Sequence, residues 1–185
     1  RMVSGFGDGA IATQRVGGQI ESITWNVADG FAAALNAFSA QNFGAKKLDR
    51  VKKGYIISAA AIAVWGSLIG IIFILFPEGI ANIFFHEPEV IAIAIGYLTI
   101  IALGEPFMCV EIVSSGAISG LGNTKLCSMI SIIFTSSRIP LAYFLSQHTT
   151  LGLRGIWWAL TITSVCKGIV FFLAFHKEHK KRALD

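Results

Sequence analysis

The chain has 185 residues, of which 54% are hydrophobic and 14% are charged, and its formal net charge is +4. Soluble domains carry roughly 25% charged residues, and a small soluble domain has too little interior to hide this much apolar surface. The composition therefore excludes an ordinary soluble domain and indicates an all-α integral membrane protein. The net charge does not indicate nucleic-acid binding, because the basic residues gather beside apolar segments, as they do in cytoplasmic loops of membrane proteins.

Residues 1–9 contain three glycines and Asp8 and are predicted to form an outer loop. Residues 10–40 predict a long helix that is less apolar than the later ones. At about 100° per residue, several polar side chains of this helix fall within a sector of roughly 80°. These residues are Gln19, Ser22, Asn26 and Asp29. Such a stripe is expected to face protein or a water-filled cavity rather than lipid.

A dense basic run separates the first helix from the second predicted span, at residues 55–76. The run contains Lys46, Lys47, Arg50, Lys52 and Lys53. Residues 55–76 contain no charge and give the clearest transmembrane signal of the chain. Because Lys and Arg collect in cytoplasmic loops, the run is assigned to the inner side and the acidic residues 77–90 to the outer side. A short interfacial helix is predicted over residues 80–85.

Three further spans complete a lobe of about five transmembrane helices over residues 10–176. The third span is interrupted by Gly104-Glu105-Pro106, because proline removes an intrahelical hydrogen bond and kinks the helix. The spans are predicted at residues 90–121, 126–145 and 153–175, and a basic cytoplasmic tail follows at residues 177–185. This topology predicts a multi-pass protein of the inner (plasma) membrane, with the N-terminus of the chain outside and its C-terminus in the cytoplasm.

Carboxylates inside predicted spans are the main candidates for a substrate or ion pathway. Glu111 lies well inside the third span, where a charge costs about 2.5–3.5 kcal/mol on insertion scales. Intramembrane carboxylates usually mark a proton, ion or substrate path; the alternative is a protonated Glu111 that hydrogen-bonds a neighbouring helix. Glu105 precedes Pro106 and would either act in that path or satisfy backbone groups freed by the kink.

Further candidates are Glu21, Asn26 and Asp29 on the first helix and Arg138 in the fourth span. Arg138 is always charged and needs a carboxylate, backbone carbonyls or water. Glu111 and Glu105 are possible partners, and a structural ion pair and a substrate contact both remain open. Lys167, in the inner half of the fifth span, is predicted to snorkel to the membrane surface.

No motif in the sequence indicates an enzyme, a cofactor or a metal site. The three cysteines are widely spaced and form no CxxC pair, and no nucleophile elbow, phosphate loop or zinc-protease motif occurs. Small residues recur at helix-packing spacing in Gly66 with Gly70 and in Gly116 with Gly120. These pairs predict close helix contacts.

Segments in three regions of the chain, in this order and at these spacings, resemble the multidrug and toxic-compound extrusion (MATE) family. The first runs from Gly30-Phe31 to Gln41-Asn42-Phe43-Gly44-Ala45, and the second is Ser115 to Lys125, with its Gly116, Gly120 and Gly122. The third comprises Arg138-Ile139-Pro140 and Gly152 to Ala159. In some sodium-coupled relatives a coupling carboxylate lies about one turn before Glu111, where this sequence has Met108.

The resemblance implies most of one six-helix lobe of a twelve-helix transporter, with the C-terminal lobe favoured and the N-terminal lobe missing. It also implies an antiporter that exports drugs or toxic organic cations, driven by Na⁺ or H⁺ and without another cofactor. Two alternatives remain open: a flippase for lipid-linked sugars on a related architecture, and a non-transporting membrane subunit.

Overall fold

The computed structural model describes residues 3–183 as a bundle of α-helices preceded by one 3₁₀ turn, Val3–Phe6. Five long helical rods make up the bundle if α4 and α5 are counted as one broken rod. The helices are α1 (Asp8–Gly44), α2 (Leu48–Leu75), α3 (Pro77–Phe84), α4 (Pro88–Ala102), α5 (Glu105–Gly120), α6 (Thr124–Gln147) and α7 (Leu153–Arg182). The all-α fold expected from the sequence is confirmed.

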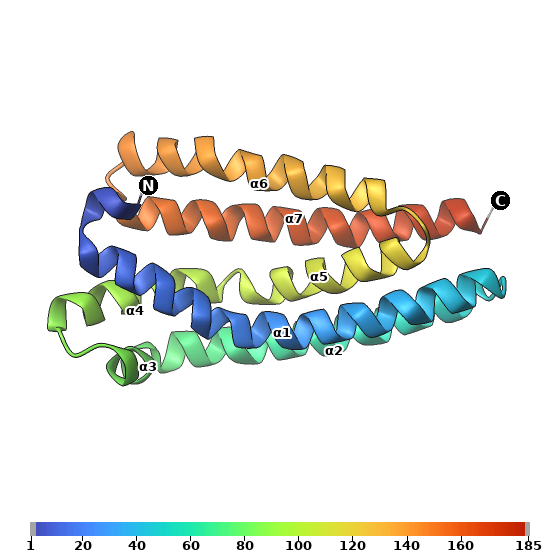
Figure 1. The fold of residues 1–185 in the computed structure, drawn as a ribbon, viewed down its shortest axis with the longest axis horizontal. Coiled ribbons are helices and arrows are strands. Elements are labelled where there is room, and N and C mark those ends of the chain that lie inside the picture. Colours follow the sequence, from blue (N-terminus) through green and yellow to red (C-terminus); the bar gives the residue numbers. More distant parts are fainter. Residues whose placement is uncertain (1–2, 184–185) are drawn as a thin grey trace.

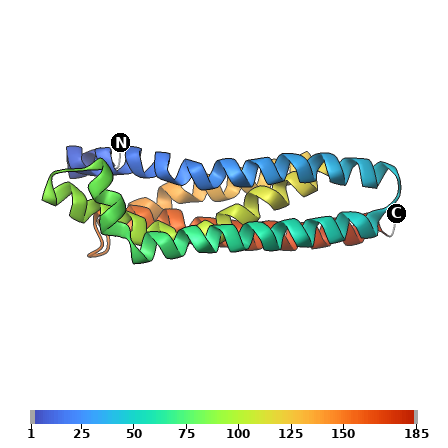
Figure 2. The same cartoon turned by 90° about the horizontal axis from the view of Figure 1, so that it is seen from below.

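The long helices run side by side along the long axis of the molecule (Figure 1). In this view α6 and α7 form an upper pair, α1 and α2 a lower pair, and α5 lies between the pairs. The N- and C-termini lie at opposite ends (Figures 1 and 2). The end that holds the C-terminus also holds the α1–α2 and α5–α6 turns, so the basic segments of the chain share one end of the bundle.

The second helix shows how an apolar sequence is divided between packing and lipid. Its buried residues recur every three or four positions and form one stripe that faces α1 and α5. They are Val51, Tyr55, Ala59, Ile62, Gly66, Gly70 and Phe73. On the other faces large apolar side chains are exposed, for instance Ile57 at 70% and Val64 at 61%. Such exposure suits a hydrocarbon solvent, and together with the other apolar helices it describes a multi-pass membrane protein.

Hydropathy and length distinguish the most apolar long helices, which qualify as membrane spans by composition, from α1, which is long but more polar. Among the described residues, α2, α6 and α7 are long and apolar enough, and the bent pair α4–α5 makes a fourth candidate span. The first helix has 37 residues and spans about 55 Å at ~1.5 Å per residue, but its polar residues leave it outside this group. Its polar side chains therefore require protein or water as neighbours.

The third predicted span is two helices, α4 and α5, which meet at an angle of 51°. The break lies at Leu103 and Gly104, directly before Glu105-Pro106, where the sequence predicts an interruption. Pro106 has no N–H to donate to the Ala102 carbonyl. At the break the Gly104 N–H donates to the Ile101 carbonyl at 2.8 Å instead of to Ile100, and the Thr161 hydroxyl donates to the Ile100 carbonyl at 3.0 Å. A neighbouring helix thus satisfies part of the interrupted backbone.

Glycines on α2 let it approach this break closely. A Cβ on Gly66 would lie 2.8 Å from Cα of Pro106, and a Cβ on Gly70 would lie 2.7 Å from the Ala102 carbonyl oxygen. The predicted close contact of this glycine pair is therefore confirmed, and it positions the junction of α4 and α5.

The basic segment that the sequence analysis assigns to a tail, residues 177–185, is helical as far as Arg182. Side-chain contacts explain the extension. Glu178 accepts a hydrogen bond from Arg182 at 2.9 Å and another from Asn123 at 3.0 Å. His179 contacts the Leu48 carbonyl at 3.0 Å, between Nε2 and O. The end of α7 is thereby held against α2 and the α5–α6 turn.

Candidate functional site

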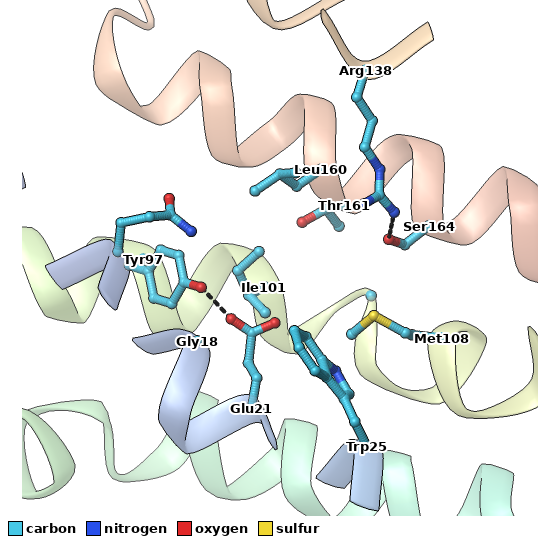
Figure 3. A pocket seen from close by; sticks show the side chains of 12 residues that line it. Gly18, Glu21, Trp25, Tyr97, Ile101, Met108, Arg138, Leu160, Thr161 and Ser164 are labelled. Atoms are coloured by element: carbon cyan, nitrogen blue, oxygen red, sulfur yellow. Dashed lines mark hydrogen bonds between the residues drawn. The ribbon is translucent and has the colours of Figure 1, made fainter. Parts of the chain in front are cut away.

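A cavity of about 160 Å³ lies inside the bundle, where α1, α4, α5, α6 and α7 converge. Figure 3 shows Glu21, Tyr97 and Trp25 on one side of it and Arg138 with Ser164 on the other. Gly104, at the break between α4 and α5, also lines the cavity. The cavity therefore joins a carboxylate, a guanidinium and the interrupted helix within one lobe.

Glu21 is held in place by α4. Its side chain is buried, with 4% of the residue exposed, and accepts a hydrogen bond from the Tyr97 hydroxyl (Figure 3). Gly17, one turn earlier on α1, leaves room for the Tyr97 ring. The ring packs edge-on against Trp157 at 5.2 Å between centroids. These contacts fix the carboxylate at the cavity wall without neutralising it.

Glu105, the first residue of α5, is completely buried. Neither of its carboxylate oxygens has a partner at hydrogen-bond geometry within residues 3–183, although the Thr24 hydroxyl, which is also without one, lies near it. It lies close enough to Glu21 for the two carboxylates to interact electrostatically. A buried carboxylate without a partner is very unfavourable in its charged form.

Arg138 enters the cavity from α6 and bonds to two hydroxyls of α7. Its Nε donates to Thr163 at 2.9 Å, and its terminal Nη2 donates to Ser164 at 3.0 Å. Neither Glu105 nor Glu111, which the sequence suggests as possible partners, forms an ion pair with it in the described part of the chain. The guanidinium is thus oriented by neutral groups, and its charge stays available to the cavity.

Glu111 pairs with Lys167, with 2.6 Å between Oε1 and Nζ. Both side chains are nearly buried, at 13% and 10% exposure. The prediction that Lys167 snorkels to the surface is therefore wrong: the side chain points at a carboxylate of α5. Glu111 also lines an open polar groove of about 400 Å³, which we call the α1–α5 groove, together with Asp29 and Asn36.

The structure divides the sequence-derived candidates between these two places. Glu21 and Arg138 line the cavity, Glu105 lies beside it, and Asp29 and Glu111 line the α1–α5 groove. Asn26 is exposed on α1 and lines neither.

Sequence reasoning missed the uncharged polar and aromatic residues that line the cavity, which are Gln14, Trp25, Tyr97, Thr161 and Ser164. Gln14 accepts a hydrogen bond from the Trp157 indole at 3.1 Å. For most of them the sequence offers one signal, a polar side chain within a mainly apolar helix, and this signal does not say which neighbour the side chain faces.

A family model decides the classification of this arrangement. The model described as MatE matches residues 1–144. The chain belongs to the MatE family. The resemblance seen in the sequence is confirmed.

Curated relatives of this MatE chain include the probable multidrug resistance protein NorM of Thermotoga maritima, which is 28% identical over 173 residues. That match covers 89% of this chain and 36% of the relative. The multidrug and toxin extrusion protein 1 of Mus musculus is 23% identical, with 94% of this chain and 31% of the relative covered. The chain thus spans about a third of the length of these relatives.

Solved structures show the same fold. The Vibrio cholerae MATE transporter VcmN in its bent form superposes with a TM-score of 0.91 at 19% identity, over 99% of this chain and 42% of that one. An inward-facing multidrug resistance MATE family transporter gives a TM-score of 0.86 at 19% identity, over 94% and 40%. The helical arrangement found here therefore corresponds to about two fifths of each structure.

Proposed function

We propose that the chain forms one lobe of a cation-coupled antiporter that exports drugs or other toxic organic compounds in exchange for Na⁺ or H⁺. The observation that carries the proposal is the cavity in which Glu21 and Arg138 face each other beside the broken rod α4–α5. The names of curated relatives, multidrug resistance and extrusion proteins, agree with it. A transport role is favoured over an enzymatic one.

The coupling ion would bind at the carboxylates beside the break. Transporters commonly place coupling ions where a membrane helix is discontinuous. Glu105 begins α5 at this break and lacks a hydrogen-bond partner among the described residues, and Glu21 is bonded by a neutral phenol. Carboxylate and hydroxyl oxygens suit either a proton or a hard cation such as Na⁺. Occupancy by one cation would relieve the repulsion between the two carboxylates.

The organic substrate would meet the polar face of α1. Gln19, Asn26 and Asp29 are exposed there, and the α1–α5 groove adds Glu111, with its Lys167 partner. A face of this kind does not suit lipid and fits the water-filled space between this lobe and a second, N-terminal lobe of the same transporter. Its carboxylates favour organic cations as substrates.

The orientation follows from the basic end of the bundle. Lys and Arg gather at the α1–α2 turn and at the end of α7, and these lie at one end of the molecule. By the positive-inside tendency this end faces the cytoplasm, so the C-terminus of the chain is inside and its N-terminus is outside. The location we propose is the inner (plasma) membrane.

The test is export of a fluorescent organic cation from cells that express the complete gene, with Na⁺ and H⁺ gradients imposed separately. We expect Glu21→Gln and Glu105→Gln to abolish gradient-dependent efflux, because the neutral amides cannot exchange a proton or bind a cation with the same charge. The matched control is Glu89→Gln, an exposed residue in the first turn of α4, which should transport like wild type.

Efflux that persists at full rate in both cavity variants would place coupling elsewhere and contradict this assignment. No efflux under either gradient would count against drug export and favour the lipid-linked-sugar flippase or a non-transporting subunit. A flippase cavity rich in Arg and Lys would bind sugar phosphates; in the described residues Arg138 is the one basic side chain that lines this cavity.

A further inference from the structure

A further concave surface lies at the basic end of the bundle, between α6 and α7, away from both the cavity and the α1–α5 groove. This groove has a volume of about 780 Å³. Its floor is apolar and consists of Leu126, Ile130, Val170, Leu173 and Ala174. Its rim at the α7 end carries three lysines, Lys177, Lys180 and Lys181. We call it the α6–α7 groove.

The change from apolar to basic follows one face of α7. Val170, Ala174, Lys177 and Lys181 are spaced three or four residues apart and so lie on the same side of the helix, with Leu173 beside them. From Val170 to Ala174 the apolar part of this face rises about 6 Å at ~1.5 Å per residue, and the lysines follow over the next two turns. A head group at the lysines would therefore place the upper carbons of an acyl chain on the apolar part.

The rim keeps its positive charge. Lys177, Lys180 and Lys181 are exposed and take part in no salt bridge within residues 3–183. The one carboxylate in the groove, Glu178, is 5% exposed and is already bonded to Arg182 and Asn123. Three unpaired cations at the end of an apolar trough complement a molecule with an anionic head and a long hydrocarbon chain.

We propose that the α6–α7 groove binds an anionic phospholipid, with its phosphate at the three lysines and an acyl chain along the apolar floor. Basic pockets between membrane helices on the cytoplasmic side are suited to acidic head groups. A soluble anion would leave the apolar floor of the groove uncovered. A zwitterionic lipid carries a cation beside its phosphate, and that cation would be repelled by the lysines. The proposal does not depend on which compound the protein exports.

The experiment measures lipids retained by the protein. The product of the complete gene is purified from micelles containing equal amounts of phosphatidylglycerol and phosphatidylcholine, and the bound lipids are counted by native mass spectrometry. A lysine near a membrane surface contributes about a fivefold preference for anionic lipid. We therefore expect Lys177→Gln/Lys180→Gln/Lys181→Gln to lower the phosphatidylglycerol preference by roughly tenfold or more.

The matched control removes the same charge at the same end of the molecule but outside the groove, as Arg50→Gln/Lys52→Gln/Lys53→Gln. These residues are exposed on the first turns of α2, and this variant should keep the wild-type preference. Ala174→Phe fills the floor without changing charge and should release the bound lipid. Size-exclusion elution confirms that each variant is folded.

Four results would each overturn the proposal. The first is no enrichment of phosphatidylglycerol on the wild-type protein, and the second is an equal loss of phosphatidylglycerol preference in the groove and control variants. The third is full lipid retention by Ala174→Phe, and the fourth is displacement of the lipid by millimolar inorganic phosphate. The first would indicate that another segment of the protein covers the groove. The second would indicate diffuse surface charge, and the last two would indicate a site for the phosphate group alone.

Discussion

The approach of α2 to the α4–α5 junction gives a prediction that can be worked out from distances. Gly66→Ala would place its methyl group 2.8 Å from Cα of Pro106, and Gly70→Ala would place one 2.7 Å from the Ala102 carbonyl oxygen. Ordinary contacts of this kind begin at 3.4 Å. The backbone of α4 and α5 must therefore retreat by about 0.6–0.7 Å at each position, because no side chain can rotate away.

Overpacking of this kind costs about 1–3 kcal/mol, while alanine gains up to about 1 kcal/mol over glycine in helix propensity. The control Gly30→Ala on α1 has nothing within 4 Å of the new methyl group, so it shows the propensity gain alone. Each test variant should then be less stable than the control by about 1–3 kcal/mol. The double variant should cost less than the sum, since one displacement of the junction relieves both contacts.

The assay is the free energy of unfolding of the purified protein in mixed detergent–SDS micelles, followed by tryptophan fluorescence. Trp65 lies next to Gly66 on α2 and reports on this interface. If Gly66→Ala, Gly70→Ala and Gly30→Ala unfold at the same SDS fraction, backbone contact at the junction is refuted. Strictly additive losses in the double variant would show that the two contacts do not share one displacement.

Three further predictions concern polar contacts. Glu111→Gln leaves Lys167 without its ion-pair partner and should destabilise by about 3–5 kcal/mol, and adding Lys167→Met should restore most of the loss in the same SDS titration. Tyr97→Phe removes the hydroxyl bonded to Glu21 and should lower the unfolding free energy by about 1–3 kcal/mol; an unchanged value would show that water replaces it. Arg138→Lys keeps the positive charge but cannot bond both hydroxyls of α7 in the same geometry, so it should reduce efflux, and Arg138→Ala should abolish it. Equal efflux by Arg138→Lys and the wild-type protein would show that charge alone matters.

The parts of the fold that follow from local chemistry were predictable. Proline cannot donate a backbone hydrogen bond, so the interruption near Pro106 was visible in the sequence. The spacing of Gly66 and Gly70 likewise predicted a close contact, because small residues admit a neighbouring backbone. The sequence did not show that these two features meet, since that depends on the relative register of α2 and α5.

The partners of the buried charged side chains could not be predicted from local sequence. Lys167 and Glu111 are 56 positions apart, and nothing local distinguishes a lysine that reaches the surface from one that meets a carboxylate. Glu21 stood out as a charge inside a helix, but its partner Tyr97 did not, because a tyrosine in an apolar helix gives no periodic signal. Asn26 could be assigned to the polar stripe of the first helix from its spacing. The sequence did not show that this exposed residue lines neither the cavity nor the α1–α5 groove.

The polarity of α1 has a consequence for how the protein is made. Arg15, Glu21 and Asp29 lie along it, and each charged residue near the centre of a membrane helix opposes insertion by about 2.5–3.5 kcal/mol. The next helix, α2, is long and apolar enough to cross a membrane by composition. The first helix therefore depends for its final place in the bilayer on α2 and α5, which leave the ribosome after it.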